Sequence, residues 1–268
     1  MMKSLENKTA AIFAANGEIA SEVARAMAER GAHVYLSGRN PEAITRLAHE
    51  ITEAGGSAEA YPADATDEQQ TDRFLTHVVE RRGRLDAVFN GIGLRAGEAA
   101  YGTPATQLPF EQFMMPLQTI LGSQFLTARV AARHMVATGT PGTIILLTAS
   151  LSRIKTPFMA GITAACAGIE GLTRSLAAEF GQTGIKAICL NATALVATRA
   201  IRETNAANAR TAGVPEEQLA EGIRRSYLLG KSPEPRHIGA LAAFLATDEG
   251  ALLNSHVVDA DFGAYNVI

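Results

Sequence analysis

Three polar side chains that could take part in catalysis follow the apolar run at 143–147. They are Ser150, Ser152 and Lys155, and they fall where a loop would leave a strand. Hydroxyl and amine groups on such a loop could serve as replacement catalytic groups, with Ser150 and Lys155 as the candidates. The alternative is that all three are ordinary solvated loop residues.

Two further kinds of reactive side chain favour structural roles. Cys166 lies in an alanine-rich helical pattern without a basic neighbour, which favours a buried, inert thiol over a nucleophile. The histidines do not have the spacing of metal ligands, so we expect no metal site. They are His33, His49, His77, His134, His237 and His256.

Composition and charge restrict the class of partner. The chain has 268 residues and a formal net charge of -3, which favours neither nucleic acid nor an anionic membrane. No stretch reaches the roughly 18 apolar residues of a membrane helix, and the N-terminal apolar run is too short for a signal peptide. Cys166 and Cys189 lie in apolar segments, which predicts reduced core thiols. We therefore expect a cytoplasmic protein with a small-molecule ligand and no nucleic-acid or membrane partner.

Alternating strand and helix patterns must position these residues. Apolar runs predict strands at 9–13, 33–36, 58–61, 87–89, 143–147, 185–190 and 256–260. Helical spacing and helix-end signals predict helices at 19–30, 41–54, 67–82, 110–136, 163–180, 216–229 and 235–247. The stretch at 198–214 is polar and rich in Ala, Asn and Arg, which predicts a mobile flap.

This alternation predicts one α/β domain over residues 1–268. Helices between successive strands imply a doubly wound Rossmann fold, with a parallel seven-stranded sheet and helices on both faces. Ligands bind such folds at the carboxyl ends of the strands, near the topological switch point. We expect the site there, with residues 198–230 as a substrate lid.

Six segments, in order along nearly the whole chain, resemble the short-chain dehydrogenase/reductase family. They are KTAAIFAANGEIASEVARAMAERGAHVYLSGRN, YPADATD, LDAVFNGIG, QFLTARVAARHM, IEGLTRSLAAEF and IGALAAFLATDEG. The resemblance implies hydride transfer between a nicotinamide cofactor and a carbonyl or alcohol. It also implies a homodimer or homotetramer through the long helices at 110–136 and 163–180. The alternative is that these helices pack only within one subunit.

The resemblance assigns cofactor contacts to the turns after the first four strands. The family's TGxxxGxG turn corresponds to residues 13–20, where small residues let the backbone approach a pyrophosphate at a helix N-terminus. Ser37 and Arg39 suit a 2′-phosphate, so NADP(H) is implied in preference to NAD. Asp64 would contact adenine or cap the third helix. The implied contacts are Asn16, Gly17, Ile19, Ser37, Arg39, Asp64, Ala65, Asn90 and Gly91.

Glu18 stands at one of the family's glycine positions. It places a carboxylate in a first helical turn, where the helix dipole favours negative charge. Glu18 could repel a dinucleotide or occupy the place of its phosphates. Alternatively, it is an ordinary acid of a helix N-terminus that faces solvent.

The family's proton relay of Asn, Ser, Tyr and Lys corresponds here to Ile120, Ala149, Ile162 and Cys166. Apolar side chains cannot transfer a proton, so these substitutions favour the absence of ordinary dehydrogenase activity. Three functions stay open. The chain could be an NADP(H)-linked oxidoreductase that works by proximity or unusual residues. It could be a non-catalytic ligand- or dinucleotide-binding protein. It could also be a non-redox enzyme, such as an isomerase or cyclase, with an apolar substrate in the vacated pocket.

Overall fold

A parallel sheet of seven strands forms the centre of the computed structural model, which describes residues 3–192 and 195–264. The strand order is β3-β2-β1-β4-β5-β6-β7. The strands are β1 (Thr9–Phe13), β2 (His33–Gly38), β3 (Ser57–Pro62), β4 (Ala87–Asn90), β5 (Thr143–Thr148), β6 (Lys186–Asn191) and β7 (Val257–Asp259). The order reverses between β1 and β4, which confirms the predicted doubly wound Rossmann fold and sets its switch point there.

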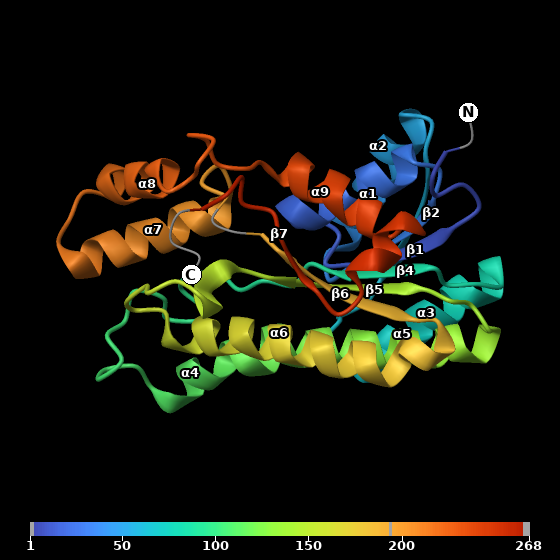
Figure 1. Ribbon diagram of the computed structural model, residues 1–268, viewed down its shortest axis with the longest axis horizontal. Coiled ribbons are helices and arrows are strands. Elements are labelled where there is room, and N and C mark those ends of the chain that lie inside the picture. The colour runs from blue at the N-terminus through green and yellow to red at the C-terminus, as the bar shows by residue number, and fades with distance from the viewer. Residues whose placement is uncertain (1–2, 193–194, 265–268) are drawn as a thin grey trace.

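Helices cover both faces of this sheet (Figure 1). One layer holds α1 (Glu18–Glu29), α2 (Pro41–Glu53) and α9 (Pro235–Leu245). The opposite layer holds α3 (Glu68–Arg82), α5 (Gly122–Thr138) and α6 (Ala160–Phe180), with α4 (Phe110–Pro116) beside α6. None of the helices in the described part of the chain is both long and apolar enough to cross a bilayer.

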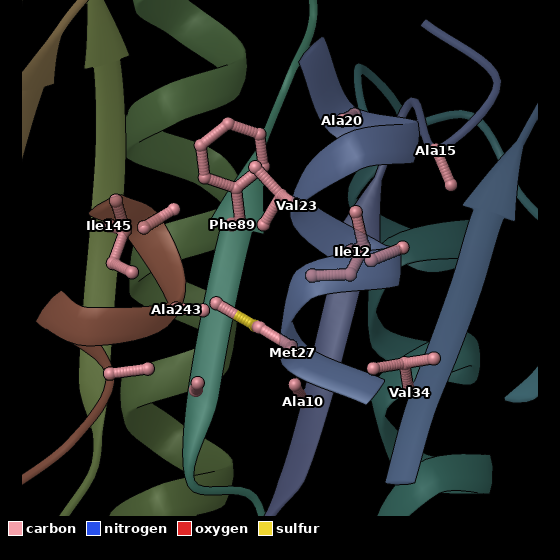
Figure 2. Close-up of a cluster of buried hydrophobic side chains, with 14 of the residues drawn as sticks. Ala10, Ile12, Ala15, Ala20, Val23, Met27, Val34, Phe89, Ile145 and Ala243 are labelled. Carbon is pink, nitrogen blue, oxygen red and sulfur yellow. The ribbon is translucent and has the colours of Figure 1, made fainter. Parts of the chain in front are cut away.

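Strand β1 shows why both layers form. Its side chains alternate between the two faces of the sheet. Ala10 and Ile12 join the cluster beneath α1, and Ala11 and Phe13 join the opposite one. All four are buried. Figure 2 shows Ile12, Val34 and Phe89 of the sheet facing α1, which contributes Val23 and Met27. Burial on both faces fixes the strand registers that align the site.

The predicted helix at 110–136 is interrupted. It consists of α4, a π-helical segment at Leu117–Leu121, and α5. Pro116 lies within α4. Proline supplies no backbone N–H and its ring crowds the carbonyl four residues earlier, which weakens the hydrogen-bond ladder of α4. Ile120 lies in the π-helical segment that follows Pro116.

The stretch predicted as a flap at 198–214 contains a regular helix, α7 (Arg199–Ala212), which the sequence pattern did not indicate. Its many Ala and Arg residues are good helix formers, and its polarity reflects an outer face rather than a lack of structure. Helix α8 (Glu216–Arg225) follows it. Both helices project beyond the carboxyl ends of the strands and are drawn in orange at the left of Figure 1.

Candidate functional site

A cleft of about 740 Å³ opens at the carboxyl ends of β1, β2 and β4, the predicted location. We call it the main cleft. Six of the nine predicted cofactor contacts line it: Asn16, Gly17, Arg39, Asp64, Ala65 and Gly91. The topology explains their meeting, because turns that follow neighbouring parallel strands emerge at the same edge of the sheet.

A second pocket of about 310 Å³ adjoins the main cleft and extends beneath α7. The two share Gly17 and the segment at 91–95. The second pocket adds Glu18 and Ile19 of α1, Leu147 of β5, and the first turn of α7. Ile19, another predicted contact, therefore lies in this continuation rather than in the main cleft. Together the two form one elongated groove across the switch point.

The turn between β1 and α1 presents backbone N–H groups to this groove. Gly17 is the N-cap of α1, and none of the described side chains caps this end of the helix. The N–H groups of residues 18–20 donate no hydrogen bond to any described residue. Free amides at a helix N-terminus form a favourable seat for a phosphate. The turn between β1 and α1 therefore offers a site for an anion.

Ala14, in the same turn, has φ of 53°. This left-handed conformation costs a residue with a Cβ roughly 1–2 kcal/mol. We expect Ala14→Gly to raise the free energy of unfolding by about 1 kcal/mol, since glycine adopts this conformation freely. Chemical denaturation measures the change. The matched control is Ala15→Gly, at a buried neighbour outside the left-handed region, which should destabilise the protein. A destabilised Ala14→Gly protein would contradict the assignment of strain.

The two residues expected to hold a 2′-phosphate have different environments. Arg39 is exposed on the wall of the main cleft and forms no ion pair with another described residue. Ser37 is fully buried, and its hydroxyl donates a hydrogen bond to the carbonyl oxygen of Ala63 at 3.3 Å. Strand β2 continues to Gly38, two residues beyond its predicted end, so Ser37 belongs to the strand. Ser37 does not line the cleft, and Arg39 alone faces it.

Asp64 does not cap the third helix. That role belongs to Asp67, whose side chain accepts a hydrogen bond from the N–H of Gln70 at 3.0 Å. The Asp64 carboxylate instead accepts bonds from the N–H and the hydroxyl of Thr66, at 2.9 and 2.8 Å. The alternative that Asp64 caps the third helix is therefore wrong. Asp64 lies at the wall of the main cleft, and its contact with adenine stays a prediction.

Asn90 lies behind the cleft and does not line it. Its side-chain amide donates to the hydroxyls of Ser123 at 3.3 Å and Thr127 at 3.1 Å. Its side-chain oxygen accepts the N–H of Ile92 at 2.9 Å. Asn90 therefore joins β4 to α5 and shapes the segment that borders both pockets, whereas the neighbouring Gly91 faces the groove.

The Glu18 carboxylate neither fills the α1 phosphate seat nor simply faces solvent. Its Oε2 accepts a hydrogen bond from the N–H of Arg199, the first residue of α7, at 2.9 Å. The side chain of α7's own N-cap, Thr198, makes no capping bond. Glu18 thus supplies an acceptor to α7 from another helix, a role that sequence reasoning did not foresee.

The residues at the four expected relay positions belong to one apolar cluster. Ile120, Ile162 and Cys166 are buried within it, and Ala149 packs against it. None of the four lines the main cleft or the second pocket. Burial raises the pKa of the Cys166 thiol, which disfavours the thiolate that a nucleophile needs. The side chains at these four positions pack in the core, and none of them presents a titratable group to the groove.

The candidate replacement groups are not brought together by any described contact. Ser150 is buried and exchanges hydrogen bonds with the side chain of Asn191, whereas Lys155 is exposed. Asn191 also donates to Asp259, which binds Arg153. This network joins β6 and β7 to the loop after β5, so Ser150 has a structural explanation.

Tyr101 is a candidate functional residue that sequence reasoning missed. It lies on the segment between β4 and α4 and packs against the cluster that contains Ile162 and Cys166. The next residue, Gly102, donates its N–H to the carbonyl of Phe158, just before α6. Burial raises the pKa of Tyr101, and the nearby Cys166 and Glu98 add to the rise, so its hydroxyl stays protonated. The long β4–α4 segment gave no pattern that would have placed this side chain beside α6.

Known proteins share this fold and sequence pattern over nearly the whole chain. The family described as enoyl-(acyl carrier protein) reductase matches residues 14–265. A probable 2,4-dienoyl-CoA reductase from Bacillus subtilis is 28% identical over 262 residues, covering 97% of this chain and 98% of the relative.

Solved structures agree in fold. An NAD⁺-bound xylitol dehydrogenase has a TM-score of 0.90 at 20% identity, covering 97% of this chain and 100% of that one. An actinorhodin polyketide ketoreductase with NADPH has a TM-score of 0.86 at 22% identity, covering 97% of each chain. With the family match over residues 14–265, these findings show that the chain belongs to the short-chain dehydrogenase/reductase family of oxidoreductases.

Proposed function

We propose that this protein binds NADP(H) along the groove and does not carry out ordinary alcohol–ketone interconversion. The observation that carries the proposal is the apolar cluster at the relay positions. Ile120, Ile162 and Cys166 are buried side chains that face neither pocket. The groove itself keeps features that suit a dinucleotide. Binding and proton transfer are thus separable properties of the site.

The groove offers a complementary group for each part of such a ligand. The free amides of residues 18–20 suit a diphosphate, and Arg39 suits a 2′-phosphate as a charged donor. Asp64 and Ala65 line the same cleft as Arg39 and would contact the adenosine. A bound nicotinamide would supply hydride chemistry. The chain's own residues would bind and orient it without a proton donor at positions 162 and 166.

Missing acid–base catalysis has a measurable consequence. General acid–base catalysis contributes roughly a hundred- to ten-thousandfold to rate. The side chain of Ile162 cannot make this contribution to the rate, because a hydrocarbon neither donates nor accepts a proton. We therefore expect any turnover to fall at least that far below the typical range of about 1–1000 s⁻¹.

The test combines binding with turnover. Calorimetric titration with NADPH, NADP⁺ and NADH should give saturable binding, with the phosphorylated forms tighter. Incubation with NADPH and a panel of ketones, aldehydes and activated enones should leave absorbance at the cofactor band unchanged. Oxidation of NADPH at an ordinary enzymatic rate would overturn the non-catalytic part. The absence of binding by all three cofactors would overturn the nucleotide part.

A second candidate is a slow oxidoreductase in which Tyr101 donates the proton. The specific observation in favour is its protonated, part-buried hydroxyl beside the cluster that contains Ile162. Tyr101 lines a separate hollow against α7 and not the groove, so the substrate would have to reach that hollow. If turnover is found, Tyr101→Phe distinguishes the two. Loss of that turnover with unchanged NADPH affinity would support Tyr101 as the donor, whereas unchanged turnover would exclude it.

An exposed apolar surface on α5 and α6 supports a homodimer or homotetramer. Phe125 and Val136 of α5 are 44% and 55% exposed, beside a hollow that Leu176 and Phe180 also line. Exposed aromatic side chains of this kind mark association surfaces. We expect light scattering to give a multiple of the 28.2 kDa chain mass and Phe125→Asp to lower it. A monomeric wild-type protein at micromolar concentration would contradict this.

A further inference from the structure

We propose that Glu18 is a charge filter for the groove: its carboxylate weakens binding of ligands that carry a diphosphate at the α1 N-terminus. The inference rests on the proposed nucleotide site and specifies which ligands that site prefers. Glu18 stands in the first turn of α1 and lines the second pocket. An anion held by the amides of residues 18–20 would therefore lie within one helical turn of this carboxylate.

The hydrogen bond to α7 fixes the carboxylate at this place. Without a partner, an exposed glutamate could turn into solvent and reduce its effect on a neighbouring anion. Here Oε2 accepts the Arg199 N–H at 2.9 Å, so the charge is held between the first turns of α1 and α7. The α7 N-terminus carries only about half a positive charge. A net negative charge remains beside the phosphate seat.

The neighbouring cations do not cancel this charge through a described ion pair. The Arg199 guanidinium binds Glu203 at 2.7 Å, and Arg202 donates to the carbonyl of Ala197 at 2.6 Å. Arg95 lines both pockets, but it is exposed and forms no ion pair with another described residue. Glu18 likewise forms no ion pair with any described side chain. Its charge acts on whatever anion enters the seat.

The filter acts on one part of the ligand only. Arg39 lies in the turn after β2, on the main cleft, whereas Glu18 lines the second pocket. A phosphate at Arg39 is attracted, and a diphosphate at α1 is repelled by Glu18 as well as held by the amides. Glu18 therefore lowers the affinity for a whole dinucleotide but leaves the affinity for an adenosine 2′-phosphate group unchanged.

Glu18→Gln removes the charge and keeps an oxygen that can accept the Arg199 N–H. We expect it to tighten NADPH binding about tenfold at low salt. This is the order of magnitude of the repulsion between a carboxylate and a nearby phosphate at a solvated surface. Affinity for adenosine 2′-monophosphate, which has no diphosphate, should stay within about twofold of wild type on the same argument. Glu18→Ala should also tighten NADPH binding. Glu22→Gln, at an acid on the next turn of α1 that lines neither pocket, should change neither affinity.

Calorimetry with the two probes separates the possible failures. If adenosine 2′-monophosphate binds every variant and Glu18→Gln leaves the NADPH affinity unchanged or weaker, the filter is wrong and the nucleotide site stands. If neither probe binds any variant, the nucleotide site is wrong and the filter fails with it. An equal gain in Glu22→Gln would show an effect of net charge and also overturn the filter.

Discussion

Arg39→Ala should weaken NADPH binding by tenfold to a hundredfold and leave NADH binding unchanged. A hydrogen bond to a charged group contributes about 1.5–3 kcal/mol, which corresponds to roughly that range in affinity. Arg39 is exposed on the cleft wall with no described ion pair to give up, so its guanidinium is available to a 2′-phosphate. Ser37, buried against Ala63, cannot share the task. In the proposed binding mode, Arg39 is therefore the side chain that distinguishes NADP(H) from NAD(H).

The control for this prediction is Arg46→Ala. Arg46 lies on α2 and is also exposed, but it does not line the cleft, and its nearest acid is Glu50 at 4.0 Å. Its removal changes net charge by the same amount as removal of Arg39. Competition titrations with NADPH and NADH measure both variants. If Arg39→Ala lowers the affinities for NADPH and NADH equally, Arg39 contacts a part of the cofactor that both share. No loss for either would remove the 2′-phosphate assignment.

The fold could be predicted because its signals are local and repeated. Every predicted strand exists, and strand β1 begins and ends where the apolar run at 9–13 does. The helix at 199–212 was missed because the polarity of its outer face masks its helix-forming Ala and Arg residues. Its place in the fold depends on a tertiary contact. Residues 199–212 form a helix that packs along the segment around Gly102, whose carbonyl accepts the Thr211 hydroxyl. Nothing near Thr211 in the sequence indicates that partner.

The site was predicted by position more reliably than by orientation. The turns after β1, β2 and β4 meet at the switch point because parallel topology requires it, so Gly17, Arg39 and Gly91 lie around one cleft. Whether a side chain faces that cleft depends on where each strand ends. A two-residue extension of β2 buried Ser37. The contacts of Glu18 and Tyr101 with distant segments have no local signal at all.

Gly91→Ala should destabilise the protein by about 1–3 kcal/mol, the usual cost of overpacking. A Cβ at position 91 would lie 2.7 Å from the Cβ of Ala20, which is too close for two carbon atoms. Ala20 is buried in α1 and cannot move away without shifting the helix (Figure 2). The methyl group of Ala20 therefore fills the space that a side chain at position 91 would need.

The double variant Ala20→Gly, Gly91→Ala tests this exchange of volume. Ala20→Gly alone should cost about 0.5–1 kcal/mol, because glycine weakens a helix. Combined with Gly91→Ala it should recover most of the loss, with a coupling energy of roughly 1–2 kcal/mol in denaturant titrations. A double variant as unstable as the sum of the two single variants would show that the residues do not compete for space. Recovery would mean that the β1–α1 turn and the end of β4 form one packing unit. The packing density of this unit would then be the same with glycine at position 20 and alanine at position 91 as with the reverse.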